Sequence, residues 1–208
     1  MQLDIVKSKK RLRAELHSKR CALTLDQQRQ ASDSIVRQLY RLTPFLKARH
    51  VGLYWAFEGE VDITSLTFDS IRNWYLPLIS DAIRPWEKQR LMFQPWLSDS
   101  QTARNRFGII EPQYDPRLMI NPLMLDVVLM PVVGFDRAGN RLGMGKGYYD
   151  RTFNRWSNSW HKPLLLGIAH SIQECDGLDS RSWDIPIQAV ITEKELIWFN
   201  SSMKINRV

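Results

Sequence analysis

The feature that most restricts the possible folds is an apolar run at residues 126–135, DVVLMPVVGF, which leads directly into a glycine-rich segment. The run lacks the polar–apolar alternation of a half-solvated strand, and it therefore predicts a strand buried on both faces. Shorter strand-like runs occur at 51–57, 74–79, 91–93, 164–170 and 188–192, among helical segments. This order predicts an α/β fold of Rossmann-like type, with three layers: a mostly parallel sheet and helices on both faces.

Two helices are predicted before the first strand. Over residues 4–20, helical spacing places Leu12 and Leu16 on one face and Lys9 and Arg13 on another. The same segment carries seven basic and two acidic side chains. It also allows an organelle-targeting peptide as an alternative, which Asp4 and Glu15 argue against.

The second helix should begin after Thr24, with Gln27 completing a capping box and Pro44 near its end. Its apolar stripe is Ile35, Leu39 and Leu42. Asp62 or Thr64 is expected to cap a further helix reaching about residue 73. Residues 80–122 contain five prolines, which predict loops and edge strands there.

Composition sets outer limits on the class of protein. With 208 residues, 44% hydrophobic and 25% charged, the chain is expected to be one globular domain spanning 1–208. No apolar run is long enough to span a bilayer, and Cys21 and Cys175 cannot build a disulfide framework or a structural zinc site. We therefore expect a cytoplasmic, monomeric protein. Its partners are expected to be small molecules, and neither a membrane nor nucleic acid.

The segment that follows the apolar run, residues 136–151, carries the chemistry. Gly143, Gly145 and Gly147 alternate with other residues, so that several backbone N–H groups can converge on one anion. Arg141 and Lys146 add full positive charges. A helix is predicted from Tyr148 to about 157, and its start adds partial positive charge. The pattern indicates a phosphate site, against the alternative of a flexible turn.

Two common phosphate-binding motifs do not match this segment. A Walker A loop fails because Gly147 follows Lys146, and a dinucleotide fingerprint fails because Tyr148 stands three residues after Gly145. Asp150, one turn into the predicted helix, is suited to hold the Mg²⁺ that accompanies a triphosphate.

The motif RLGMGKGYYDR at 141–151 closely resembles the signature of the 5-formyltetrahydrofolate cyclo-ligase family. The resemblance extends over nearly the whole chain, in the family's order: KKRLRAEL near the start, GEVDI at 59–63, FGIIEP at 107–112, DVVLMPVVGFD before the signature and WDIPIQAVITE at 183–193. One departure is Met144, where many members have a basic residue. This removes one side-chain phosphate contact and leaves the backbone cradle.

The resemblance implies an ATP- and Mg²⁺-dependent cyclisation of 5-formyltetrahydrofolate to 5,10-methenyltetrahydrofolate, with release of ADP and phosphate, in folate one-carbon metabolism. It implies catalytic roles for Lys146 and Arg141. The residues it assigns to ATP are Lys9, Arg13, Arg141, Leu142, Gly143, Met144, Gly145, Lys146, Gly147, Tyr148 and Tyr149. The residues it assigns to the folate are Trp55, Glu60, Met144, Gly145, Lys146, Gly147 and Tyr148. It assigns Mg²⁺ to Asp150 and Asp184.

Other interpretations of these residues stay open at this stage. Lys9 and Arg13 by themselves fit solvated charges, Trp55 fits the core, and Asp184 fits a turn or helix cap. His50 and His170, which flank strands, are expected to be structural.

Two further function classes also stay open. The net charge of +7 and the basic helix suit a nucleic-acid-binding module, although no recognised nucleic-acid motif is present. A sugar-phosphate isomerase or an acyl-transfer enzyme could use a similar scaffold without a nucleotide.

Overall fold

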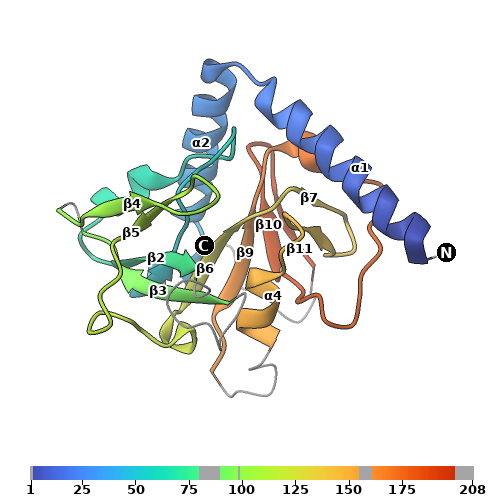
Figure 1. Ribbon diagram of the computed structural model, residues 1–208. Helices are drawn as coiled ribbons and strands as arrows, with labels where there is room; N and C mark the ends of the chain where they lie inside the picture. The colour runs from blue at the N-terminus through green and yellow to red at the C-terminus, as the bar shows by residue number, and fades with distance from the viewer. Residues whose placement is uncertain (1, 80–89, 98, 155–160, 200–208) are drawn as a thin grey trace.

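The computed structural model describes residues 2–79, 90–97, 99–154 and 161–199, with side chains from residue 8 onward (Figure 1). The helices are α1 (Gln2–Cys21), α2 (Leu25–Leu39), α3 (Thr43–Lys47) and α4 (Tyr148–Phe153), with short 3-10 helices at Thr64–Phe68 (η1), Pro122–Met124 (η4) and Ser171–Gln173 (η6). The strands are β1 (His50–Gly52), β2 (Asn73–Ile79), β3 (Leu91–Pro95), β4 (Thr102–Arg104), β5 (Ile110–Pro112), β6 (Val127–Pro131), β7 (Gly134–Phe135), β8 (Arg141–Leu142), β9 (Leu164–Ile168), β10 (Ala189–Ile191) and β11 (Leu196–Trp198).

Seven of these strands form the central sheet, in the order β11-β10-β9-β6-β1-β2-β3. The five inner strands pair in parallel, and the edge strands β3 and β11 pair antiparallel to their neighbours. Two small antiparallel pairs, β4–β5 and β7–β8, lie outside this sheet. The mostly parallel α/β sheet predicted from the sequence is confirmed.

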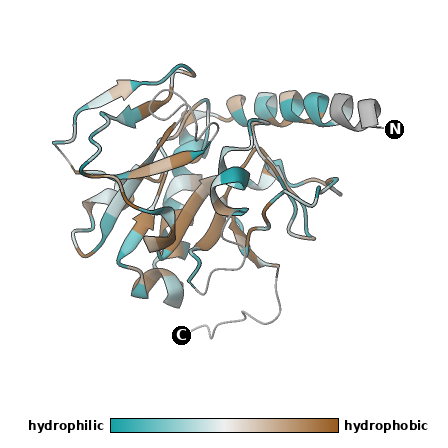
Figure 2. Ribbon diagram, turned by 60° about the horizontal axis from the view of Figure 1, so that its bottom comes forward, coloured by the Kyte–Doolittle hydropathy of each residue, from teal (hydrophilic) through white to brown (hydrophobic). Residues whose placement is uncertain are grey.

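Alternate residues of β6 face two different hydrophobic clusters, as expected for a strand buried on both faces. Val127 and Leu129 pack in the cluster that includes Ile35 and Leu39 of α2, whereas Val128 and Met130 belong to the cluster that includes Phe153 of α4. Figure 2 shows that hydrophobic residues concentrate in the central strands. Helices therefore cover both faces, which confirms the three layers.

Helix α1 lies across one end of the sheet, beside η6 and β7 (Figure 1). Leu16 is buried and, together with the partly buried Leu12, packs against Val133 and Leu142. The rest of the helix is largely hydrophilic in Figure 2. Its apolar face therefore anchors α1 over the segment that follows β6. Among the described residues, no helix is both long and apolar enough to cross a membrane.

Several predicted boundaries need correction. The predicted helix up to residue 73 is only the 3-10 turn Thr64–Phe68, because Asn73 already begins β2. The run at 126–135 is interrupted between β6 and β7, and the run at 51–57 contributes only the short strand β1. Helix α4 ends at Phe153, and residues 155–157 of its predicted extent lie outside the described ranges.

The predicted capping box at the start of α2 is confirmed. Thr24 N donates to Gln27 Oε1 at 2.9 Å, and Gln27 N donates to Thr24 Oγ1 at 3.2 Å. These bonds satisfy backbone donors at the helix start. Ile35 and Leu39 are fully buried, whereas Leu42 lies beyond the end of α2, next to α3.

Candidate active site

A cavity of about 740 Å³ lies beyond the carboxyl ends of β1 and β6. Strand β1 pairs with both β2 and β6, and the chain continues from β1 to one side of the sheet and from β6 to the other. This reversal is the topological switch point at which open α/β sheets bind ligands. The cavity brings together every predicted site residue: Lys9, Arg13, Trp55, Glu60, Arg141, Leu142, Gly143, Met144, Gly145, Lys146, Gly147, Tyr148, Tyr149, Asp150 and Asp184.

The glycine loop, residues 141–150, forms one wall of the cavity. Gly145 has a φ of +90° and Gly147 a φ of +67°, both in the left-handed region that side chains rarely adopt. Lys146, between them, is exposed, and its carbonyl accepts a hydrogen bond from the Arg151 guanidinium. Backbone and ammonium group are thus accessible from the cavity. The need for glycine predicted from the sequence is confirmed at 145 and 147.

Helix α1 contacts this loop directly. Arg13 Nε donates to the Gly143 carbonyl at 2.8 Å, and Lys9 Nζ lies 3.9 Å from Asp184 Oδ2. Burial lowers the pKa of the Arg13 guanidinium, while Asp184 opposes that shift. Because both side chains are half-buried and line the cavity, they are not simply solvated charges. Their contact with a nucleotide stays a prediction.

Arg141 and Asp150 form an ion pair inside the cavity wall. Arg141 Nη2 donates to Asp150 Oδ1, which also accepts from the Ile185 backbone N–H at 3.0 Å. The Arg141 Nε is buried and has no hydrogen-bond partner within the described ranges. Leaving such a donor unpaired costs about 1–3 kcal/mol, so a bound anion that accepted from it would be stabilised.

The two aspartates fit a hard cation. The bond from Ile185 N to Asp150 holds the segment containing Asp184 next to Asp150. Among the described residues, Asp150 Oδ2 and Asp184 Oδ1 accept no hydrogen bond, so each carboxylate keeps one oxygen available. In those ranges there is no cluster of three or more His, Cys, Asp or Glu side chains suited to a metal. Mg²⁺ commonly takes one or two carboxylates and completes its shell with phosphates and water, which is the set available here.

The opposite wall holds Glu60 and aromatic rings. Burial raises the pKa of Glu60 to about 7, and the Arg20 guanidinium opposes that shift. Trp55 lines the cavity and also packs against the core, with its ring centroid 5.4 Å from that of Trp96. Trp55 therefore contributes both to the core and to the cavity lining, and its contact with the folate stays a prediction. Burial also raises the pKa of Tyr149, which stays neutral.

Some residues of the cavity have no predicted role. Phe107 lies with its ring centroid 6.4 Å from that of Tyr148 and 6.0 Å from Lys146 Nζ. It belongs to the FGIIEP segment, which the sequence singles out without assigning it any chemistry. Arg181 and Trp183 also line the cavity, and neither has a role predicted from the sequence, although Trp183 begins the WDIPIQAVITE segment.

Comparison with known proteins finds similarity over most of the chain. The model of the 5-formyltetrahydrofolate cyclo-ligase family matches residues 5–193. A 5-formyltetrahydrofolate cyclo-ligase of Haemophilus influenzae is 35% identical over 183 residues, covering 86% of this chain and 94% of the relative. The one from Escherichia coli is 33% identical over 186 residues, covering 88% and 98%.

Solved structures agree with these sequence relatives. The NMR structure of Aquifex aeolicus 5,10-methenyltetrahydrofolate synthetase superposes with a TM-score of 0.78 at 32% identity, covering 95% of this chain and 96% of the other. A 5,10-methenyltetrahydrofolate synthetase from Mycoplasma pneumoniae gives a TM-score of 0.68 at 25% identity, covering 89% and 98%. Both the sequence and the fold are thus similar to one group of proteins.

Proposed function

The chain belongs to the 5-formyltetrahydrofolate cyclo-ligase family and is an enzyme of that kind, and from this premise we propose that it converts 5-formyltetrahydrofolate to 5,10-methenyltetrahydrofolate at the expense of ATP, with Mg²⁺. The observation that carries the proposal is a single cavity with two different walls. One wall is a basic glycine loop, and the other carries a buried carboxylate among aromatic rings.

The chemistry explains why both walls are needed. A formamide carbonyl is a poor electrophile, so its oxygen must first become a leaving group. The formyl oxygen attacks the γ-phosphorus, and the bond from that phosphorus to the bridging oxygen breaks to release ADP. N10 then attacks the activated formyl carbon, the carbon–oxygen bond breaks and phosphate leaves with the former formyl oxygen. Deprotonation at N10 accompanies ring closure.

The glycine loop supports the phosphoryl-transfer step. Such transfers depend on positioning and charge neutralisation more than on a protein nucleophile. In this proposal Lys146 neutralises charge on the transferred group, while Lys9 and Arg13 from α1 bind the other phosphates. Arg141 offers its unpaired Nε to an anion, although its Nη2 is already committed to Asp150. This makes Arg141 a less mobile charge than Lys146.

The second wall supports binding of the folate. Glu60 lines the cavity with 8% of its side chain exposed, next to Trp55. The pterin ring presents N–H donors along one edge, which a carboxylate can accept, and its faces can contact aromatic rings. Met144 and Tyr148 also line the cavity, and in this proposal they lie between the two substrates.

Asp150 and Asp184 are the residues that would hold Mg²⁺. When bound, the ion would neutralise charge on the nucleotide's phosphates. Within the described part of the chain, Asp150 Oδ2 and Asp184 Oδ1 accept no hydrogen bond, and they would supply hard oxygen ligands for it. The pairing of Asp150 with Arg141 also orients that carboxylate.

The test is a turnover assay on the purified chain. With ATP, Mg²⁺ and 5-formyltetrahydrofolate together, we expect the absorbance of the methenyl product to rise and ADP to form in equal amount. Omitting ATP, or chelating Mg²⁺ with EDTA, should abolish both signals. Absence of product under all conditions would contradict the proposal, and product formed without ATP would favour an acyl-transfer or isomerase chemistry on the same scaffold.

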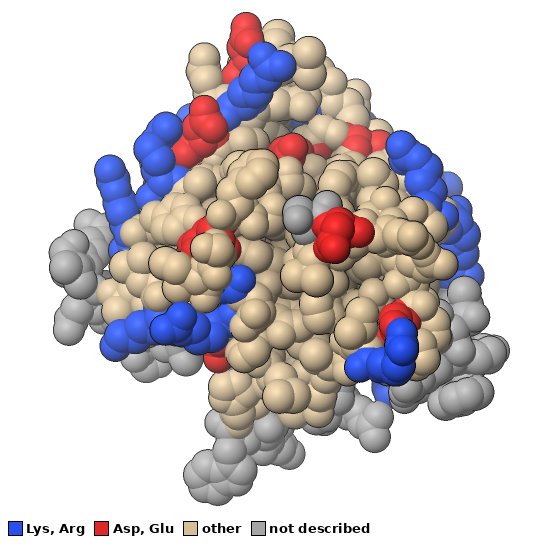
Figure 3. Space-filling model, turned by 90° about the vertical axis from the view of Figure 1, so that its left-hand side faces the viewer, with Lys and Arg blue, Asp and Glu red and all other residues tan. Residues whose placement is uncertain are grey.

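Small-molecule substrates and a monomeric chain in the cytoplasm complete the proposal. On the face seen in Figure 3, lysine and arginine side chains lie in separate groups toward the rim, and acidic side chains lie among the uncharged residues between them. A nucleic-acid interface normally gathers its basic groups into a continuous patch or stripe. That no nucleic acid binds stays a prediction, which binding measurements at low and high salt would check.

A further inference from the structure

The turn at residues 57–60, which presents Glu60 to the cavity, has an unusual backbone. Glu58 has a φ of +48° and Gly59 a φ of +77°, and Glu58 is the only non-glycine residue with positive φ in the described ranges. Glu60 N donates to the Phe57 carbonyl at 3.1 Å, and Phe57 N donates to Glu60 Oε2 at 3.2 Å. A backbone of this kind persists only where its surroundings hold it.

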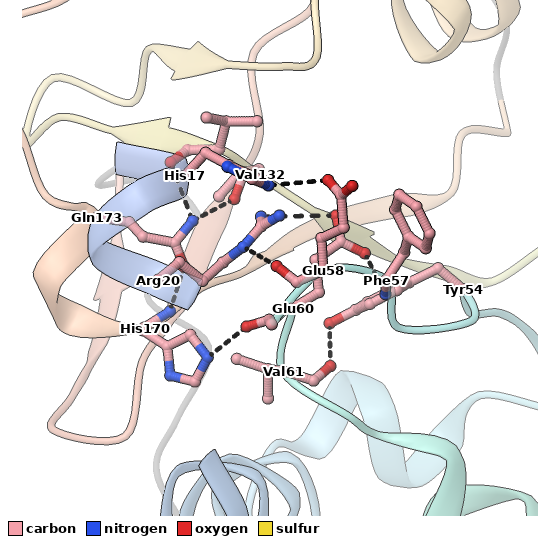
Figure 4. Close-up of polar contacts among 12 residues, drawn as sticks. His17, Arg20, Tyr54, Phe57, Glu58, Glu60, Val61, Val132, His170 and Gln173 are labelled. Carbon is pink, nitrogen blue, oxygen red and sulfur yellow. Dashed lines mark hydrogen bonds and ion pairs between the residues drawn. The ribbon is translucent and has the colours of Figure 1, made fainter. Parts of the chain in front are cut away.

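Side chains from two distant parts of the sequence, the end of α1 and the segment just before η6, hold this turn (Figure 4). From α1, Cys21 Sγ donates to the Glu58 carbonyl at 3.2 Å and His17 Nε2 lies 2.8 Å from Glu58 Oε2. Arg20 Nε, from the end of α1, donates to the Glu58 carbonyl at 3.0 Å. His170 Nε2, just before η6, lies 3.1 Å from the Gly59 carbonyl oxygen, which confirms the structural role predicted for this histidine. The turn is therefore fixed from two sides, and Arg20 and His170 are themselves buried.

Arg20 also faces the carboxyl group of Glu60. Its Nη1 lies 3.7 Å from Glu60 Oε1, and only 3% of the Arg20 side chain is exposed. At this distance the contact is an ion pair without a close hydrogen bond, so Glu60 is not saturated by Arg20 and can still accept from a ligand. Burying an ion pair this deeply costs free energy, because both charges lose their hydration. Its presence beside the cavity therefore suggests a role in the site.

The other titratable groups around Glu60 do not offer a second positive charge. They are Glu58 in the same turn, Tyr54 after β1 and Tyr149 in α4. His17 of α1 also faces this turn, with its Nε2 2.8 Å from Glu58 Oε2, and it pairs with Glu58 instead of Glu60. Burial raises the pKa of both tyrosines, so they are neutral. His170 faces Arg20, and burial lowers its pKa, which keeps it neutral near pH 7. Among the described residues around Glu60, the full positive charge is that of Arg20.

We propose that Arg20 is a positioning residue for the folate: acting through Glu60, it holds that carboxylate toward the cavity and in its charged form. This rests on the proposed function, in which Glu60 binds the pterin. Since α1 also carries Arg13, bonded to the glycine loop, one helix would align the two walls of the cavity.

The pH dependence of folate binding distinguishes this role from a merely structural one. Burial raises the pKa of Glu60 to about 7, with Arg20 as the largest opposing influence. Removing the positive charge should move the Glu60 ionisation to still higher pH. An upward shift of about one unit would raise KM for the folate about tenfold at pH values below both midpoints, and the loss should fade above them.

The main variant is Arg20→Met, which keeps most of the stem and removes the charge. KM and kcat for 5-formyltetrahydrofolate are measured at saturating Mg-ATP from pH 5.5 to 9. We expect the KM midpoint to move upward by about one pH unit, with a smaller change in kcat. A profile that superposes on that of the wild type, or a KM raised equally at every pH, would overturn the proposal.

Arg72→Met is the matched control. Arg72 is also an arginine with a 3% exposed side chain, paired with Asp69 and bonded to the Phe45 carbonyl, and it lies outside the cavity. Its loss should lower thermal stability without moving the pH midpoint of KM. An equal shift in both variants would assign the effect to general destabilisation and refute the proposal.

A double-mutant cycle tests whether Arg20 acts through Glu60. In a Glu60→Gln background, Arg20→Met should change KM by less than about twofold, because the group it acts on is gone. Full additivity would contradict the proposal. If Arg20→Met does not fold, Arg20→Lys keeps the charge and loses the planar fork, and it should raise KM with little movement of the midpoint.

A measurement without turnover separates this inference from the proposed function. The carboxyl carbon of Glu60, followed by NMR with ¹³C-labelled glutamate, reports its ionisation directly in the wild type and in Arg20→Met. If the wild type does not turn over the folate, the proposed function fails while the titration still tests the Arg20–Glu60 link. An unchanged Glu60 titration in Arg20→Met would overturn the inference even with activity intact.

Discussion

The two walls of the cavity present their charges in opposite ways. On the glycine loop, Lys146 is exposed between two glycines with positive φ, and its charge is available to a ligand without reorganisation. On the opposite wall, Glu60 is almost completely buried and its pKa is raised to about 7. An exposed cation suits a ligand that brings its own negative charge, whereas a buried carboxylate suits neutral N–H donors and must be kept ionised by a neighbour.

The largest expected effect comes from removing the exposed charge. Lys146→Ala should lower turnover by ~10²–10³, because electrostatic stabilisation of the transferred phosphoryl group is lost while no buried contact is disturbed. Steady-state kcat at saturating substrates measures this, with circular dichroism to show that the fold is kept. Lys146→Met separates the charge from the stem. Near-normal turnover in both variants would exclude Lys146 from the phosphoryl-transfer step.

Asp150→Asn should have the next largest effect. An amide is a weaker ligand for a hard cation, so the Mg²⁺ concentration for half-maximal activity should rise roughly ten- to a hundredfold, with KM for the folate little changed. The same substitution removes the counter-ion of Arg141, so unfolding is measured in parallel. Lower stability of Asp150→Asn with unchanged Mg²⁺ dependence would make Asp150 a partner of Arg141 only.

Glu60→Gln is the opposite case: it should raise KM for the folate and leave the Mg²⁺ titration unchanged.

Gly145→Ala tests the backbone of the glycine loop. A φ of +90° is strained for any side chain, and the new Cβ would lie 3.2 Å from Arg13 Cζ. The loop or the Arg13 guanidinium bonded to it must therefore shift, and we expect the Kd for Mg-ATP to rise about tenfold by calorimetric titration. Gly177→Ala, where a Cβ meets nothing within 4 Å, is the matched control. Equal affinity in the two variants would mean that the phosphates bind elsewhere.

The last effect concerns stability instead of turnover, at the buried wall. The pKa of Glu60 is raised from 4.5 to about 7 on folding, so the folded chain keeps a proton that the unfolded chain loses as the pH rises between these values. Stability should therefore fall as the pH rises through this window, by about 3 kcal/mol over the whole of it. His170, whose pKa is lowered by burial, contributes in the opposite direction.

Urea unfolding of the wild type and Glu60→Gln at pH 5 and pH 8 isolates the contribution of Glu60, because the other titrating groups are common to both. The wild type should lose stability relative to Glu60→Gln at the higher pH. A constant difference between the two would show that Glu60 does not titrate in this range, and would remove the contrast between the two walls.

Local features were predictable where the residues that cause them lie close together in the sequence. The capping box of Thr24 and Gln27 depends on residues three apart, and the burial of β6 on both faces follows from its lack of alternation. The demand for glycine at 145 and 147 is likewise local, since it reflects the backbone conformation of those residues. Length of the elements was less predictable: the apolar runs at 51–57 and 126–135 extend past the points where neighbouring strands stop pairing.

Other features depend on residues that meet only after folding. Arg13 reaches the Gly143 carbonyl across 130 positions of the sequence, and Arg20 reaches the turn of Glu58 across 38. The spacing of seven between Arg13 and Arg20 puts both on one side of α1, which is the signal in the sequence that Arg20 is not an ordinary surface charge. Its partner and its burial could not be inferred, because a side chain's electrostatic environment is set by the groups packed around it. The sequence alone therefore determined the sheet, the glycine loop and the chemical types at the site, whereas tertiary packing decided which charges are exposed, which are paired and where Glu60 ionises.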